Sequence, residues 1–136
     1  MDHDARWSHE QSLAAKPLSV VRARWLVGHR LLEHGLRSIV EDVPLVVSEL
    51  ATNAIQHAPP PFTLSLQGFG DYVFLAVLDG SLKRPQLVAG PGLDADGGRG
   101  LSLVNAMSSD WGVAETPVGG KSTLASFDTQ HATTPP

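Results

Sequence analysis

Three consecutive prolines at residues 59–61 divide this sequence into two parts with different hydrophobic patterns. An α-helix cannot continue through them, because proline lacks a backbone N–H and its ring clashes with the preceding turn. Before the prolines, apolar residues recur at helical spacing, whereas short β-rich runs such as FTLSLQ and YVFLAVL come after them. The sequence therefore predicts an α/β protein in which two helices precede the strands.

The first predicted helix covers residues 18–34. Pro17 is tolerated in a first helical turn, and Gly35 is a suitable helix stop. The apolar residues that keep helical spacing, with Leu26 beside them, are Leu18, Val21, Trp25 and Leu32. This spacing is typical of an amphipathic helix, and Trp25 is interpreted as a core or interface aromatic residue.

The second predicted helix starts near Asp42, which can cap it, and ends at the prolines. Its apolar stripe consists of Val43, Val47, Leu50 and Ala54. At about 100° per residue, Glu49 and Asn53 lie on the flank of this stripe, roughly 40° apart. The helix therefore carries a carboxylate and a carboxamide at one edge of its buried face.

The other elements follow in the order strand, strand, loop, helix, strand, strand. YVFLAVL is apolar on both faces, as a central strand would be. A long loop over residues 79–100 precedes a short helix over residues 101–107. WGVAE and STLASF are predicted strands joined across TPVGGK. This order predicts a two-layer α/β sandwich, with helices on one face of a mixed, mostly antiparallel sheet.

A chain of 136 residues has the length of one domain. We expect a flexible arm over residues 1–15, the domain over residues 16–128 and a disordered tail over residues 129–136. The formal charge of -4 argues against nucleic acid and anionic membranes as partners, because both favour clustered Lys and Arg. No signal peptide and no apolar run of roughly 20 residues is visible, which predicts a soluble, cytoplasmic protein.

Several kinds of site are not predicted. Cysteine is absent, which excludes disulfides, thiolate zinc sites and a Cys nucleophile. The six histidines show no clustering of the kind that metal sites have. VGGKST is similar to the end of a P-loop, but Glu115 stands where the first glycine belongs and a strand pattern follows where a helix is required. A GxGxxG turn between a strand and a helix, typical of dinucleotide-binding folds, is also missing.

Four polar segments occur in a fixed order, namely SELATNAIQHA, VLDGS, GGRGLSLVNA and GGKST. Together they resemble the N, G1, G2 and G3 boxes of the histidine-kinase-like ATPase superfamily, which has the Bergerat ATP-binding fold. The resemblance covers roughly residues 18–127. It is closest to the small bacterial branch that includes the anti-sigma-factor serine/threonine kinases, where SEL, TNA, a following H, and GRGL before WGV recur together. ATP and Mg²⁺ are the cofactors that this resemblance implies.

The resemblance gives Glu49 and Asn53 roles in catalysis. In the family, the carboxamide matching Asn53 coordinates Mg²⁺ between the phosphates, and the carboxylate matching Glu49 acts as a general base. Mg²⁺ favours hard oxygen ligands, and a carboxylate one helical turn away can deprotonate a hydroxyl that attacks the γ-phosphate. The alternative interpretation is that both are solvated residues on the flank of the helix.

The remaining boxes are expected to bind the nucleotide. Asp79 resembles the adenine reader of the family, Gly80 would allow close approach of the base, and Ser81 stands where the family often has glycine. A turn aspartate after a strand is the alternative for Asp79. The ATP lid is expected over residues 90–100, where glycines before a helix leave N–H groups free to face an anion. The other expected nucleotide-binding residues are Gly98, Arg99, Gly100, Leu101, Lys121 and Ser122.

Two functions of different classes follow from the resemblance. In the first, the protein transfers the γ-phosphate of ATP to a Ser or Thr of a small antagonist protein, binds a sigma factor and so controls transcription. In the second, it is a nucleotide-dependent switch that changes partners through its lid without phosphotransfer. Glu49 and Asn53 favour the first, because neither is needed merely to hold an adenine ring. A homodimer is also compatible with the resemblance, since many relatives dimerise.

Overall fold

The computed structural model describes residues 5–57, 61–80, 98–116 and 119–129. Its helices and strands are β1 (Trp7–Leu13), α1 (Pro17–Glu33), the 3₁₀ helix η1 (Arg37–Ile39), α2 (Asp42–His57), β2 (Phe62–Gly68), β3 (Tyr72–Asp79), α3 (Gly98–Met107), β4 (Asp110–Glu115) and β5 (Lys121–Asp128). The strands form one sheet in the order β1-β2-β3-β5-β4. Each of these helices and strands, except β1 and η1, corresponds to an element predicted from the sequence.

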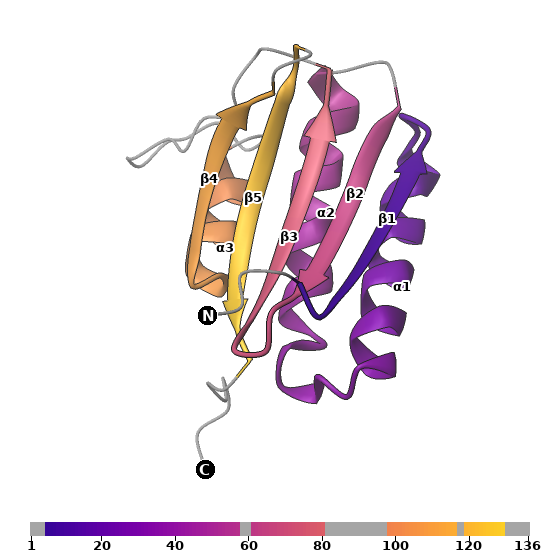
Figure 1. Ribbon diagram of the computed structural model, residues 1–136. Helices are drawn as coiled ribbons and strands as arrows, with labels where there is room; N and C mark the ends of the chain where they lie inside the picture. Colours follow the sequence, from indigo (N-terminus) through magenta and orange to yellow (C-terminus); the bar gives the residue numbers. More distant parts are fainter. Residues whose placement is uncertain (1–4, 58–60, 81–97, 117–118, 130–136) are drawn as a thin grey trace.

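Figure 1 shows the three α-helices on one face of the sheet, which confirms the predicted α/β sandwich. Each pair of neighbouring strands in the described sheet is antiparallel. β3 is the central strand, as predicted, although helices cover only one of its faces. Among the described residues, no helix has both the length and the apolar character needed to cross a membrane.

The flexible arm predicted over residues 1–15 is wrong for Trp7–Leu13, because these residues form the edge strand β1 and pair with β2. The sequence WSHEQSL has only two large apolar residues, so its strand character is weak when read in isolation. Pairing with β2 and the packing of Trp7 compensate for this weakness. Trp7 lies over Gly68, where an added Cβ would be 2.1 Å from the indole ring. A contact between two strands therefore decides that this segment is ordered.

The helix predicted over residues 18–34 is present, but its apolar stripe faces solvent. Leu18, Val21, Trp25 and Leu32 are 52–67% exposed. The residues of α1 that the fold buries are Ser19, Ala23, Val27 and Leu31. Both sets keep helical spacing, so periodicity alone does not identify the side that meets the sheet. Of the two interpretations of Trp25, the core residue is therefore wrong, and the interface residue stays a prediction.

α1 ends as predicted, with a glycine in the left-handed conformation. Gly35 has φ of 73°, which suits a residue without a side chain. Its N–H donates to the Leu32 carbonyl and the Leu36 N–H donates to the Leu31 carbonyl, which is the hydrogen-bond pattern of a Schellman motif. This motif fixes the backbone of His34, the C-cap residue, at the end of the helix.

α2 lies against the middle of the sheet and supplies much of the core. Its buried apolar residues are Val43, Val46, Val47, Leu50, Ala51 and Ala54. They include the whole of the stripe predicted for this helix. The sheet contributes alternate residues of β2 and β3, namely Phe62, Leu64, Leu66, Val73, Leu75 and Val77. The core therefore fills the space between the helix layer and one face of the sheet.

The orientation of α1 can be tested with two neighbouring leucines. Leu31 is 0% exposed in the core, whereas Leu32 is 52% exposed on the outer side of the same helix. We expect Leu31→Ala to lower the free energy of unfolding by about 2–5 kcal/mol, because it leaves a cavity. Leu32→Ala should change it by no more than roughly 0.5 kcal/mol. Urea unfolding of both variants measures the difference, and a larger effect at Leu32 would contradict this orientation.

Candidate functional site

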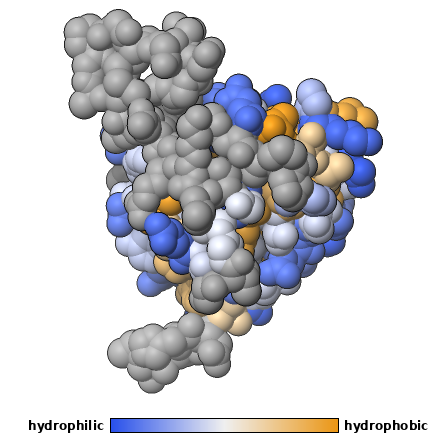
Figure 2. Space-filling view, turned by 90° about the horizontal axis from the view of Figure 1, so that it is seen from above, coloured by the Kyte–Doolittle hydropathy of each residue, from blue (hydrophilic) through white to orange (hydrophobic). Residues whose placement is uncertain are grey.

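The polar segments identified in the sequence meet at one end of the molecule. In Figure 1, the C-terminal ends of α2 and β3 and the start of β5 lie at the upper end, and the N-terminal end of α3 points toward this end from behind β4. α2 contacts both α3 and β3. Figure 2 views this end from above and shows hydrophilic residues around smaller hydrophobic areas. The topology thus gathers segments that are far apart in the sequence.

Asp79 and Lys121 form a buried ion pair at this end. Asp79 is the last residue of β3, Lys121 is the first residue of β5, and the register of the two strands places them opposite each other. The Lys121 Nζ lies 3.0 Å from Oδ1 and 2.9 Å from Oδ2 of Asp79. Asp79 is 6% and Lys121 3% exposed. Lys121, which was predicted to bind the nucleotide, here holds the carboxylate that was predicted to bind adenine.

A carboxylate oxygen can accept more than one hydrogen bond, so the ion pair does not exhaust the capacity of Asp79. Each of its oxygens accepts a hydrogen bond from the lysine amine. The lysine also orients the carboxylate, because one amine contacts both oxygens. This pairing was not among the sequence predictions, and only the register of β3 and β5 reveals it.

Gly120 allows the chain to approach the backbone of Asp79 closely. Its φ is 89°, and an added Cβ would lie 2.2 Å from the Asp79 carbonyl oxygen. Gly119 has a φ of 91°, but an added Cβ there would have no heavy atom within 4 Å. Both glycines of the predicted turn therefore adopt a positive φ that other residues rarely adopt. At Gly120, a side chain would in addition overlap the backbone of Asp79. Gly120 sets the position of Lys121 relative to Asp79.

Glu49 and Asn53 lie one turn apart on α2. Both are partly buried, next to the buried residues Leu50 and Ala54. This is the environment expected for the flank of a buried stripe. A partly buried carboxylate and carboxamide retain access to a ligand while the core fixes the helix that carries them.

α3 begins three residues earlier than predicted, so that Gly98 and Gly100 lie in its first turn. The first N–H groups of a helix have no acceptor within the helix, and they form the positive end of its dipole. For Arg99 and Leu101, only the backbone is described. The N-terminal end of α3 is thus suited to an anion, as the sequence predicts from the glycines.

The other predicted residues are distributed around this end. Gly80 is exposed directly after β3, and Ser122 is partly buried in β5, opposite Leu78 of β3. Ser81 and residues 90–97 of the predicted lid lie outside the described residues. The described parts of all four polar segments therefore lie on α2, β3, α3 and β5, of which α2 contacts α3 and β3, and β3 pairs with β5.

One comparison with known protein families gives a match over most of the chain. The model of the histidine kinase-like ATPase domain matches residues 13–125. The matched range contains Glu49, Asn53, Asp79 and Lys121, and it starts at the last residue of β1. A comparison with curated proteins gives no match.

Two neighbouring glycines test the close approach to Asp79. Both Gly119→Ala and Gly120→Ala place a side chain at positive φ, which costs about 1–2 kcal/mol. Gly120→Ala should cost roughly 1–3 kcal/mol more, because the new methyl group overlaps the Asp79 carbonyl. Urea unfolding measures both losses, with Gly119→Ala as the control for backbone strain. Equal losses would show that the contact with Asp79 does not restrict residue 120.

Proposed function

The chain belongs to the histidine kinase-like ATPase domain family, and on this premise we propose that it transfers the γ-phosphate of ATP to a Ser or Thr of a small antagonist protein. In this proposal it acts as an anti-sigma-factor kinase in the cytoplasm, and a sigma factor is its second partner. The observation that carries the proposal is the position of Glu49 and Asn53. They lie partly buried, one turn apart on α2, a helix that contacts both β3 and α3.

Asp79 is the proposed reader of adenine. The exocyclic amino group of adenine donates to the carboxylate, whereas guanine presents a carbonyl oxygen at the same position and would be repelled. The buried ion pair with Lys121 supports this role, because it holds the carboxylate in one orientation at the end of β3. Gly80 is exposed beside it and leaves room for the base.

The phosphates are proposed to lie between α2 and the start of α3. The free N–H groups of Gly98 and Gly100 would contact the phosphate oxygens. The Asn53 carboxamide would provide one oxygen ligand to Mg²⁺, and the phosphates and water would provide the others. Mg²⁺ would thus neutralise charge on the phosphates while Asn53 fixes its position relative to α2.

Glu49 is the proposed general base. Its carboxylate would accept the proton of the seryl or threonyl hydroxyl as that oxygen attacks the γ-phosphorus. The bond between the γ-phosphorus and the bridging oxygen would break, and ADP would leave with Mg²⁺ stabilising the charge. A Glu four residues before the metal-binding Asn is at the distance of one helical turn, which suits a base beside the phosphate.

Nucleotide binding can be tested by calorimetric titration with ATP, ADP and GTP, with and without Mg²⁺. We expect binding selective for adenine nucleotides, which Mg²⁺ strengthens. Asn53→Ala should remove the Mg²⁺ effect. Loss of the hydrogen bond to Asp79 should weaken ATP binding about 10–100-fold, because hydrogen bonds to charged groups contribute about 1.5–3 kcal/mol.

A variant that tests the role of Asp79 must not leave its partner Lys121 as a buried, unpaired charge. A single Asp79→Ala change would leave Lys121 buried without its partner, which is strongly destabilising. The double variant Asp79→Leu/Lys121→Met removes both charges and the hydrogen-bond acceptor at residue 79, while both side chains keep a similar size. Its fold is checked by circular dichroism against the wild-type protein. Equal ATP affinity of the double variant and wild type would show that Asp79 does not read adenine.

Phosphotransfer is tested with γ-labelled ATP and purified candidate antagonist proteins. Glu49→Gln should retain ATP binding, since its size is unchanged, and should transfer phosphate about 10²–10⁴-fold more slowly, because a general base contributes that factor. Wild-type rates in the variant would exclude Glu49 as the base. ATP binding without transfer to any candidate would favour the alternative function, a nucleotide-dependent switch between partners.

A further inference from the structure

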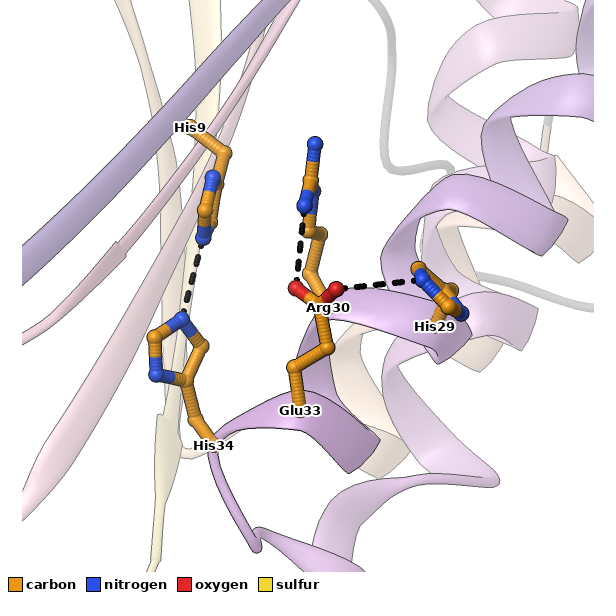
Figure 3. Close-up of polar contacts among 5 residues, drawn as sticks. All are labelled: His9, His29, Arg30, Glu33 and His34. Carbon is orange, nitrogen blue, oxygen red and sulfur yellow. Dashed lines mark hydrogen bonds and ion pairs between the residues drawn. The ribbon is translucent and has the colours of Figure 1, made fainter.

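Two histidines and a glutamate meet where β1 passes the end of α1. The ligand atoms of His9, Glu33 and His34 all lie within 4.8 Å of one another. The sequence prediction that the histidines do not cluster is wrong, because the fold brings His9 and His34 together across 25 positions. Figure 3 shows their rings pointing toward each other, with Glu33 and Arg30 beside them. We propose that His9, His34 and Glu33 bind a divalent transition-metal ion, with Zn²⁺ as the reference ion.

The two imidazoles have nearly the separation that one metal ion requires. Nε2 of His9 lies 3.0 Å from Nε2 of His34, so one ring donates its N–H to the lone pair of the other. Zn–N bonds are about 2.0–2.1 Å long, and two nitrogens on one tetrahedral ion are therefore about 3.3–3.4 Å apart. If the two Nε2 atoms move apart by a few tenths of an ångström, a metal ion can take the place of the proton that they share.

Both rings are held in position before any metal binds. The His34 ring stacks on Trp7, with ring centroids 4.0 Å apart and planes 5° from parallel. Trp7 in turn packs over Gly68, and the Schellman motif at Gly35 fixes the backbone next to His34. His9 lies on β1, two residues after Trp7, and pairs with Leu66 of β2. A site with fixed ligands loses little conformational entropy on binding.

Glu33 provides the third ligand, and the residues that it contacts in this structure affect the affinity of the site for a metal ion. Its Oε1 accepts from Arg30 at 2.9 Å, and its Oε2 lies 3.1 Å from Nε2 of His29. The carboxylate must turn one oxygen from these partners toward the imidazoles to complete the site. The Arg30 guanidinium also repels a cation. Arg30 therefore weakens the site, and its removal should strengthen binding.

The donor set selects the class of metal. Two imidazoles and one carboxylate suit Zn²⁺, Ni²⁺ and Cu²⁺, whereas Mg²⁺ prefers oxygen ligands. The chain has no cysteine, so no thiolate competes for these ions. The Glu33 side chain is 42% exposed, which gives an ion access from solvent. The fourth position of a tetrahedral site would be filled by water.

The proposed metal would join the edge strand to the helix layer. Among the described strands, β1 pairs only with β2, and it precedes the matched family domain except for Leu13. The C-terminal end of α1 lies at the lower end in Figure 1, opposite the end where α2 meets β3 and α3. A metal bound by His9 and His34 would therefore stabilise the attachment of β1 without occupying the proposed nucleotide site.

Metal binding is tested by calorimetric titration of the full chain, without a purification tag, with ZnCl₂, NiCl₂ and MgCl₂. We expect one saturable Zn²⁺ per chain, binding of Ni²⁺, and no binding of Mg²⁺ at this site. His9→Ala and His34→Ala should each weaken Zn²⁺ binding by more than about 100-fold, since even outer-shell changes cost about 10–100-fold. Arg30→Met should bind Zn²⁺ more tightly than wild type. His29→Ala, on the same helix, is the matched control and should retain binding.

Metal binding can also be measured on the wild-type protein, so that the test does not depend on whether the variants fold. In ¹⁵N-labelled protein, Zn²⁺ should shift the imidazole resonances of two of the six histidines, and the melting temperature should rise with Zn²⁺ concentration. The proposal is overturned if no saturable binding occurs, if the imidazole resonances of His9 and His34 do not shift, or if His29→Ala abolishes binding while His9→Ala does not. In those cases the imidazole pair is a hydrogen bond that holds β1 to α1 and nothing more.

Discussion

The burial of one side of α2 against the sheet determines the position of every other part of the molecule. Six apolar residues of this helix are at most 2% exposed, and they pack on alternate residues of β2 and β3. Protein interiors are close-packed, so a helix with such a face has one stable rotation. Turning α2 by one residue, about 100°, would bury Glu49 and expose part of the core. The same contacts that stabilise the fold therefore hold Glu49 and Asn53 at its rim.

The buried ion pair of Asp79 and Lys121 contributes less clearly to the stability of the fold than the apolar core does. Removing two charges from water is unfavourable, and apolar residues of similar volume often give equal or greater stability. The pair is therefore weak as an explanation of stability. Under the proposed function it has a clear use, because it presents an oriented carboxylate beside Gly80, where a base can approach. Gly120 supports this arrangement by letting the β5 end of the turn lie against Asp79.

The two ends of the molecule differ in the chemistry that they offer. The end proposed to bind the nucleotide carries side-chain oxygens and the N-terminal N–H groups of α3, which are groups that suit Mg²⁺ and phosphates. The opposite end of α1 has imidazoles that face each other at 3.0 Å, which suits softer transition metals. Because the preferred ligands differ, the two proposed metals would not compete for the same residues.

The sequence by itself determined the ends of α1 and α2, the central position of β3, the turn before β5 and the segments that form the candidate site. These features depend on proline, glycine and periodicity, which act over a few residues. The tertiary structure decided which side of α1 is buried, that residues 7–13 form a strand, and that Lys121 pairs with Asp79 across 42 positions. Periodicity cannot assign the face of a helix that is apolar on two sides. Contacts such as Lys121 with Asp79 and His9 with His34 depend on strand register and helix position, which only the packed chain fixes.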